Sequence, residues 1–208
     1  RIGFDQGVAE RKILFLGKEI DAEYHKRLGE LALVDDRDIS IVYTPLHGVG
    51  ATSVVPALKS LGYDNLHLLA EQAIPDGSFP TVLGGVPNPE DPATMTLAIE
   101  KAREMGADIV LASDPDADRL GCALPLEGIG WDAKPHELAL NGNQIGAILC
   151  HHILQSLTQT GKMPEKGLVA KTIVTTDLTG IIGRAFGAEV VHNLLVGFKY
   201  IGAVSVDN

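Results

Sequence analysis

The sequence predicts an α/β protein made of two consecutive α/β domains, with mixed, mainly parallel sheets and helices on both faces. Short apolar stretches rich in β-branched residues alternate with longer amphipathic stretches, which is the order of parallel strands joined by helices. A glycine- and proline-containing stretch at residues 127–144 interrupts this alternation once. With 208 residues, 45% of them hydrophobic, the chain is long enough for two small domains.

The first domain is expected at residues 16–134, after residues 1–15 that would link it to a preceding domain. Residues 21–33 space their apolar side chains as an amphipathic helix does. Residues 39–44, ISIVYT, are largely β-branched and apolar and run into the turn PLHGVG, which predicts a buried strand. Apolar positions three and four residues apart then predict a helix at 51–62, and NLHLLA supplies a second strand.

A long loop precedes the third strand. Residues 71–92 contain five prolines and no regular period, and loops of this length tend to be functional. A helical pattern at 93–105 stops at a glycine, and the continuous apolar stretch at 107–113 predicts a strand. LGCALPL, at 120–126, predicts a strand that returns beside it. Right-handed crossovers make the earlier strands parallel, so ligands are expected at their carboxyl ends.

The second domain is expected at residues 135–208, where the same alternation resumes. Its expected elements are a helix at 145–157, a strand at 167–176, a helix at 178–187, a strand at 188–195, and a helix that begins within residues 196–204. The chain begins with Arg1 rather than methionine, so we expect a piece of a longer protein.

Composition and charge argue against several function classes. The formal net charge is −10 and no Lys/Arg cluster is present, which is unlike a nucleic-acid-binding surface. The sequence has no apolar run of the roughly 18 residues that a membrane span needs, so no membrane partner is expected. Cys122 and Cys150 offer no disulfide framework and are expected as buried small residues in a cytoplasmic protein.

Three aspartates follow the third strand. SDPDADRLG, at 113–121, places Asp114, Asp116 and Asp118 at alternate positions. Residues two apart in an extended strand are separated by roughly 6.5–7 Å, so the loop must turn for all three carboxylates to reach one ion. Like charges this close raise one another's pKa, and a hard divalent cation relieves the repulsion. Oxygen-only ligands favour Mg²⁺; the alternative is a solvated acidic turn.

Arg119 directly follows the third aspartate. Beside a bound cation an arginine is electrostatically disfavoured unless an anion lies between them, and phosphate is its natural bidentate partner. The alternative is that Arg119 pairs with the aspartates themselves. An EF-hand loop is ruled out, because its sixth and twelfth positions would be Arg119 and Pro125 instead of glycine and glutamate.

Histidines elsewhere are weaker candidates. His47 lies in PLHGVG, but Ser53 stands where a dinucleotide-binding motif has its third glycine, so a tight structural turn is expected. His151 and His152 lie on an apolar helix without a third metal ligand, so packed or surface histidines are expected there.

SDPDADRLG resembles the metal-binding loop of the α-D-phosphohexomutase superfamily. Other stretches are similar in sequence and in order to motifs of phosphoglucomutases and phosphomannomutases: VYTPLHGVG, PDGSFPTV, VPNPE, NGNQIGAIL, KTIVTT and VGFKYIG. The resemblance covers residues 39–202 and corresponds to the second and third of the family's four domains.

The resemblance implies a reversible shift of phosphate between the 1- and 6-positions of a hexose, through a phosphoserine enzyme and a bisphosphate intermediate. It implies that Mg²⁺ bridges the three aspartates and the phosphoserine, and that Arg119 grips the phosphate or sugar. Lys199 matches the lysine of a family motif that commonly reads Thr-Gly-Phe-Lys, which makes it a candidate for substrate contact and acid/base catalysis. Val196 stands in place of the usual threonine. The alternative for Lys199 is a solvent-facing helix lysine.

Other parts of the family pattern have no counterpart in this sequence. No segment resembles the phosphoserine loop, the Gly-Glu-Glu-Ser sugar-recognition loop or the C-terminal phosphate-binding domain. The chain alone is therefore expected to be inactive, with a phosphorylated sugar and the missing N- and C-terminal domains as its partners. Phosphopentomutase activity in the longer protein, or a metal-binding or interaction module without mutase activity, stays open.

Overall fold

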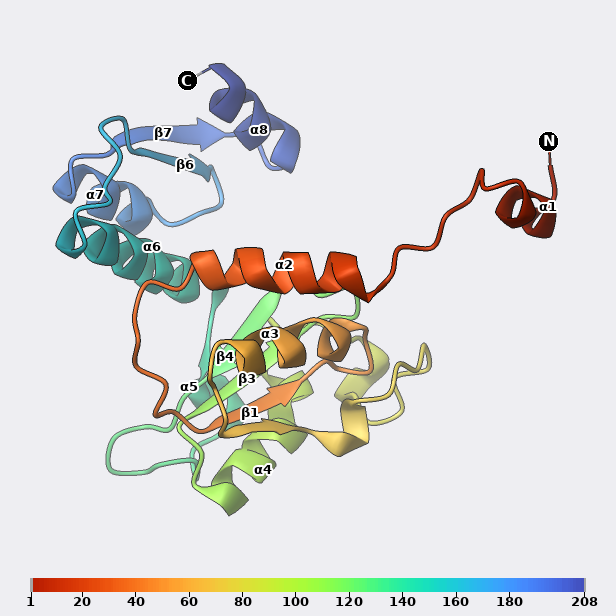
Figure 1. Cartoon of the computed structure of the whole chain (residues 1–208). Coiled ribbons are helices and arrows are strands. Elements are labelled where there is room, and N and C mark those ends of the chain that lie inside the picture. The colour runs from red at the N-terminus through yellow and green to blue at the C-terminus, as the bar shows by residue number, and fades with distance from the viewer. Residues whose placement is uncertain (1, 208) are drawn as a thin grey trace.

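The first half of the chain is built on a five-stranded sheet in the order β2-β1-β3-β4-β5 (Figure 1). The computed structural model describes residues 2–207. β1 pairs in parallel with β2 and β3, whereas β4 returns antiparallel to β3 and pairs with β5. The strands are β1 (Ile41–Thr44), β2 (Leu66–Leu68), β3 (Ile109–Ser113), β4 (Leu120–Ala123) and β5 (Ala139–Leu140).

Helices cover both faces of this sheet. They are α2 (Lys18–Glu30), α3 (Val54–Ser60), α4 (Thr96–Met105) and α5 (Pro135–Leu138). In Figure 1, α3 lies above the sheet and α4 below it, and α2 packs against α3. α4 is capped after Met105 by Gly106, whose left-handed backbone (φ 65°) a glycine adopts without strain. The short helix α1 (Phe4–Ala9) lies apart from the rest of the molecule, on the segment expected as a linker.

The core lies between this sheet and α4. Val42 and Val110 from β1 and β3 are fully buried against Ala98 and Ile99 of α4. Trp131 closes the core, and its indole Nε1 donates a hydrogen bond to the backbone oxygen of Ala107 (2.7 Å). Burial of these apolar side chains is the main force that holds α4 and the strands together.

The stretch expected as a junction contributes to the first sheet. Leu138 of α5 is only 2% exposed and belongs to the same core, and β5 adds the fifth strand up to Leu140. The elements of the first unit therefore continue past residue 134. The division of the chain at residues 15 and 134 stays a prediction.

The second unit follows directly. α6 (Gly142–Gln159) packs against α7 (Asp177–Ala185), which joins the parallel strands β6 (Leu168–Thr172) and β7 (Glu189–Leu194). α8 (Phe198–Asp207) contacts both strands, and in Figure 1 it lies on the other side of them from α6 and α7. The predicted α/β class with mixed, mainly parallel sheets is confirmed.

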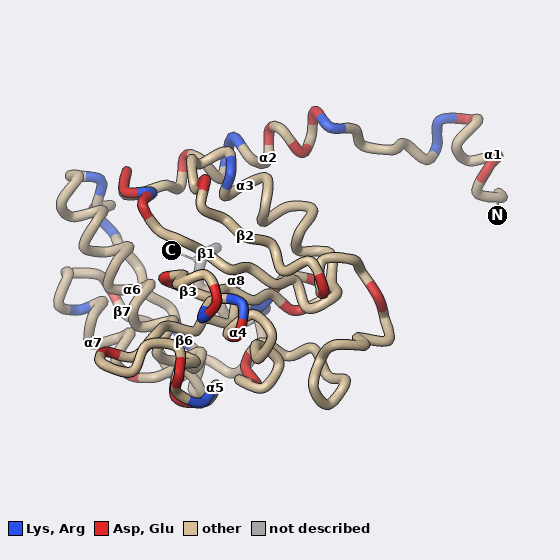
Figure 2. Tube along the Cα trace, turned by 90° about the horizontal axis from the view of Figure 1, so that it is seen from below, with Lys and Arg blue, Asp and Glu red and all other residues tan. Residues whose placement is uncertain are grey.

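Charged side chains are distributed over both units. Figure 2 shows Lys and Arg interspersed with Asp and Glu along the trace. Between residues 2 and 207, no helix is both long enough and apolar enough to cross a membrane.

Candidate metal centre

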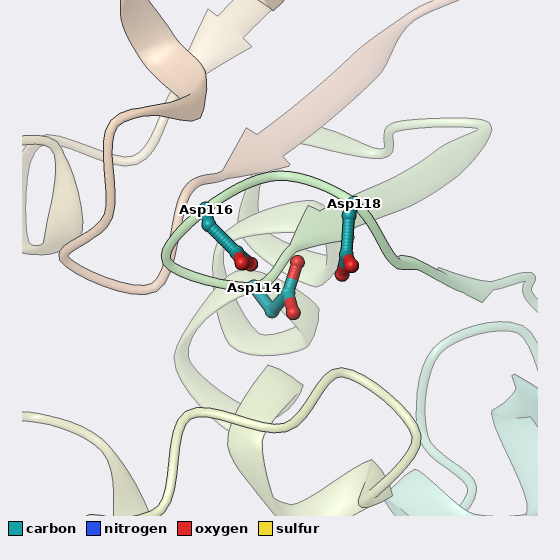
Figure 3. Close-up of side chains that lie close together, drawn as sticks. All are labelled: Asp114, Asp116 and Asp118. Carbon is teal, nitrogen blue, oxygen red and sulfur yellow. The ribbon is translucent and has the colours of Figure 1, made fainter. Parts of the chain in front are cut away.

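The three aspartates converge in the loop between β3 and β4, at the carboxyl end of the central strand (Figure 3). One carboxylate oxygen from each of Asp114, Asp116 and Asp118 lies within 4.8 Å of the others. The loop turns because Ala117 adopts a left-handed backbone (φ 60°) and its N–H donates to the oxygen of Asp114 (3.0 Å). The curled loop expected from the spacing is therefore present.

The turn after β1 packs against the aspartate loop and supports it. The turn after β1 approaches so closely that a Cβ added at Gly48 would lie 2.7 Å from the carbonyl carbon of Pro115. The N–H of Val49 donates to the oxygen of Pro115 (2.9 Å). This role of the turn was missed from the sequence. Its signal was available, because β1 and β3 are parallel and their following turns meet at one sheet edge.

The three carboxylates differ in their surroundings. Asp114 is 2% exposed, whereas Asp116 and Asp118 are exposed. Burial raises the pKa of Asp114, but hydrogen bonds from the backbone N–H and Nε of Arg119 (3.0 and 2.7 Å) outweigh it and hold that pKa below its ordinary value. The pKa of Asp118 is raised by the negative charge of Asp116 and then of Asp114. Arg119, whose Nε lies 3.8 Å from Oδ1 of Asp118, offsets only part of this, so the outer part of the loop carries a net repulsion.

Arg119 connects the aspartate loop with the long loop at residues 71–92. Its Nε donates a hydrogen bond to Oδ2 of Asp114 (2.7 Å), and its Nη1 donates to Oδ1 of Asn88 (2.9 Å), in the VPNPE stretch. In this arrangement Arg119 pairs with the aspartates, as the alternative interpretation expected. Contact of Arg119 with a phosphate stays a prediction.

A groove of about 520 Å³ opens over these residues, a size typical of small-molecule sites. Its walls come from the turn after β1, the long loop and the aspartate loop. The lining residues are Val49, Val86, Pro87, Asn88, Asp114, Pro115, Asp116 and Arg119.

His47 anchors the long loop. It is 6% exposed, its Nδ1 lies 3.2 Å from the oxygen of Ile74, and its Nε2 lies 2.8 Å from Oγ1 of Thr81. Both ring nitrogens therefore contact protein atoms, and Leu46 and His47 have the positive φ values of a tight turn. His151 packs edge-on against the ring of Phe186, as expected for a packed histidine.

Lys199 lies apart from the groove. It is exposed in the first turn of α8, its Nζ lies 4.9 Å from the ring centroid of Tyr200, and it does not line the groove. The structure brings Arg119 and the three aspartates together and leaves Lys199 outside this group. A cleft shared by Arg119 and Lys199 stays a prediction.

The donor set fits a hard divalent cation. It offers carboxylate oxygens and no nitrogen or sulfur ligand. Neighbouring ligand oxygens around Mg²⁺ at about 2.0–2.1 Å are roughly 3 Å apart, so the exposed side chains of Asp116 and Asp118 need to move only slightly.

Comparisons with known proteins identify the family of the chain. Residues 22–127 match the family model of phosphoglucomutase/phosphomannomutase α/β/α domain II, and residues 141–207 match domain III. The chain is 36% identical over 190 residues to a probable phosphomannomutase of Haemophilus influenzae, covering 91% of this chain and 36% of that protein. It is 35% identical over 199 residues to a phosphoglucomutase of Staphylococcus saprophyticus, covering 95% of this chain and 34% of that protein.

Solved structures show the same fold. A putative phosphomannomutase from Thermus thermophilus superposes with a TM-score of 0.65 at 20% identity, covering 90% of this chain and 39% of that one. A Burkholderia thailandensis phosphoglucomutase/phosphomannomutase family protein gives a TM-score of 0.64 at 19% identity, covering 90% and 36%. The chain spans roughly a third of the length of the curated relatives described above. The chain belongs to the phosphoglucomutase/phosphomannomutase family of α-D-phosphohexomutases, and it carries domains II and III of that family.

Proposed function

We propose that this chain supplies domains II and III of an enzyme that interconverts hexose 1-phosphate and hexose 6-phosphate through a phosphoserine and a bisphosphate intermediate. The observation that carries this is the convergence of Asp114, Asp116 and Asp118 at the carboxyl end of β3, in a chain that belongs to the family. The protein would act in the cytoplasm, with the remaining domains of the family as its partners.

The three aspartates would hold Mg²⁺. When bound, such an ion neutralises negative charge on a transferring phosphoryl group, which is most of what a protein must supply in this chemistry. The chain's own contribution is to hold the loop in place. Asp114 is buried and fixed by two hydrogen bonds from Arg119, and the turn at Gly48 supports Pro115 from the other side.

Arg119 would hold the phosphate at the edge of the groove. It is 47% exposed, and its guanidinium lies between Asp114 and Asn88. A cation on Asp114 would take over part of the charge that now attracts Arg119. The guanidinium would then gain more from a phosphate in the groove than from the carboxylate.

Lys199 would contact the sugar side of the substrate and assist proton transfer. It lies on the second unit, so this role requires that unit to close over the groove. The chain alone would have no mutase activity, because no segment in it resembles the family's phosphoserine loop. A pentose phosphate is the alternative substrate, and a metal-binding module without mutase activity is the alternative function.

Steady-state kinetics with a hexose 1-phosphate at saturating Mg²⁺, in the protein with all its domains, test these roles. Arg119→Ala should lower kcat by about a hundredfold, because it removes charge stabilisation in the transition state. Lys199→Ala should raise KM at least as much as it lowers kcat. Lys162→Ala, at an exposed lysine outside the groove, is the matched control.

Near-wild-type kinetics of Arg119→Ala would remove that residue from the site, and the same result for Lys199→Ala would make it a solvent-facing lysine. Because Arg119 also supports Asp114, the Mg²⁺ affinity of Arg119→Ala must be measured separately. Metal binding without turnover of hexose or pentose phosphates by the complete protein would favour the module.

A further inference from the structure

A second polar cavity, of about 420 Å³, lies in the other unit, between α7 and the β6–β7 sheet. It shares no residue with the groove at the aspartate loop. Charged side chains from α7 and β6, and polar side chains from β7, line it. The lining residues are Lys171, Asp177, Gly180, Ile181, Arg184, Val190, His192 and Asn193.

The backbone explains how these side chains meet. On α7, Asp177, Gly180 and Arg184 are spaced at three and seven residues, so they share one helix face. Gly180 lets α7 approach β7 closely, because a Cβ there would lie 3.2 Å from Cγ1 of Val190, and the guanidinium of Arg184 lies on the same side of the helix. The register of β6 and β7 shifts between Ala170 and Thr172, so the irregularity falls at Lys171.

Lys171 is the unusual member of this cluster. Its side chain is 4% exposed, and a buried ammonium is costly unless it is paired. Its Nζ donates to the oxygen of Thr172 (3.3 Å) and forms an ion pair with Asp177 (3.0 Å). The side chain of Asp177, however, is 88% exposed. The buried cation is thus balanced by a carboxylate that can turn away into water.

The cavity carries an excess of positive charge. Lys171 and Arg184 bring cationic side chains and His192 brings an imidazole, whereas Asp177 is the one carboxylate among the lining residues. The hydrogen bond from Lys171 lowers the pKa of Asp177, and His192 and Arg184 add smaller electrostatic contributions in the same direction. All three basic groups are therefore close enough to interact with an anion at the position of the Asp177 carboxylate.

We propose that this cavity binds a small phosphate monoester, whose phosphate is held by Lys171, Arg184 and His192. A phosphate dianion matches the charge of the cluster better than a carboxylate does, and its three oxygens can accept from all three basic groups. The amide of Asn193 provides a neutral donor at the same rim. The volume leaves room for a sugar-sized group beside the phosphate. The phosphate bound there would belong to a second ligand, distinct from the group transferred at the aspartate loop.

Histidine side-chain NMR of the 208-residue chain, in buffer without divalent metal, tests this site. The sequence has seven histidines, and the resonance of His192 is assigned from its loss in His192→Gln. The probes are inorganic phosphate, glucose 6-phosphate and glucose. We expect saturable shifts of His192 with both phosphates, with glucose 6-phosphate at least as tight as inorganic phosphate, and no shift with glucose. A response to inorganic phosphate alone, or to neither, would overturn the assignment.

Variants at exposed positions sharpen the test. Arg184→Gln should weaken glucose 6-phosphate binding about tenfold, through loss of a charge-assisted hydrogen bond. Asp177→Asn should tighten it, because the competing carboxylate is gone. Lys162→Gln, at an exposed lysine outside the cavity, should leave the affinity unchanged. Wild-type affinity in Arg184→Gln, or weaker binding in Asp177→Asn, would contradict the proposed site. Because Lys171 is buried, its replacement tests folding as much as binding and is not needed.

Discussion

The two units use the same strand–helix–strand scheme, but only the first encloses its core in the part of the chain described. In the first, β3 and β4 extend the sheet beyond β1, and both faces bury apolar side chains against helices. In the second, two strands carry α6, α7 and α8, and large apolar side chains remain exposed. Among them are Ile148, Leu149, Ile153, Leu178, Ile181 and Phe198.

This difference determines how much packing within this chain holds each candidate residue in position. A two-stranded sheet buries little surface by itself, whereas three or more strands with a packed face are stable. The aspartate loop follows the central strand of the larger sheet and has a second loop behind it. Lys199 lies in the first turn of α8, which contacts only the smaller sheet closely, and the first residue of that helix, Phe198, is 83% exposed. The metal centre is therefore testable in this chain, whereas the role of Lys199 is testable only with the other domains.

The largest expected effect is a difference between the two units in the cost of truncating a leucine. Leu138→Ala should lower the free energy of unfolding by about 2–5 kcal/mol, because Leu138 is 2% exposed within the first core. Leu149→Ala, at a leucine of α6 that is 45% exposed, should cost about 1 kcal/mol or less. Chemical denaturation of both variants measures the difference. Equal losses would mean that α5 does not belong to the first core.

Replacing a glycine by alanine should change the stability of the protein in opposite directions in the two units. Gly48→Ala should destabilise the protein by about 1–3 kcal/mol, because its Cβ would overlap the backbone of Pro115. Gly146→Ala lies within α6 with open space around the added methyl group, so it should stabilise by about 0.5–1 kcal/mol through helix propensity. Thermal unfolding checks both signs. A neutral Gly48→Ala would contradict the support of the aspartate loop by the turn.

A smaller effect is expected from the charges of the loop. The raised pKa of Asp118 means that its ionised form is disfavoured in the folded protein, so the penalty develops as the pH rises through the ordinary value of 3.8. Without metal, Asp118→Asn should therefore raise Tm slightly at pH 7, with the gain fading as the pH falls below 3.8.

Asp114→Asn should have the opposite effect and lower Tm at pH 7. The pKa of Asp114 is lowered, so its contribution to stability is present at neutral pH and is lost as the pH falls through its folded-state pKa. Melting curves of both variants from acidic to neutral pH would measure these two opposite changes in Tm. A lower Tm for Asp118→Asn at pH 7 without metal would rule out net repulsion at that position.

The smallest effect concerns thiol reactivity, which reports local packing without changing it. Burial raises the pKa of Cys122 in β4 to about 11, and it raises that of Cys150 on α6 as well. Cys122 is 7% exposed, whereas Cys150 is half-buried. A thiol-specific reagent at neutral pH should modify Cys150 first, and Cys150→Ser should retain only the slow reaction. Equal rates in the native protein would show that the first core opens as readily as the second unit.

Local pattern in the sequence was enough for most elements of both units. The β-branched stretch at 39–44 contains β1, and the apolar stretch at 107–113 contains β3, because burial on both faces leaves a continuous apolar run. The helix expected at 21–33 instead begins at Lys18 and ends at Glu30. Helix ends depend on capping and on tertiary contacts, which the apolar period does not specify.

Long-range contacts could not be read in this way. Leu138 lies in a stretch that resembled a junction, and its burial depends on the core it meets. The contact of Arg119 with Asn88 joins loops 31 residues apart in sequence. The curl of the aspartate loop followed from like charges and turn residues close in sequence, whereas its support by Gly48 depended on the pairing of β1 with β3.

Calorimetric titration of Mg²⁺, with Mn²⁺ as a second probe, into the 208-residue chain tests the central claim most directly. We predict one saturable site in the wild type and a loss of roughly tenfold or more in affinity for both Asp116→Asn and Asp118→Asn. Asp64→Asn, at an exposed aspartate far along the chain from the loop, should bind as the wild type does. No saturable binding at millimolar metal, or equal affinity in all these variants, would contradict a metal centre at Asp114, Asp116 and Asp118.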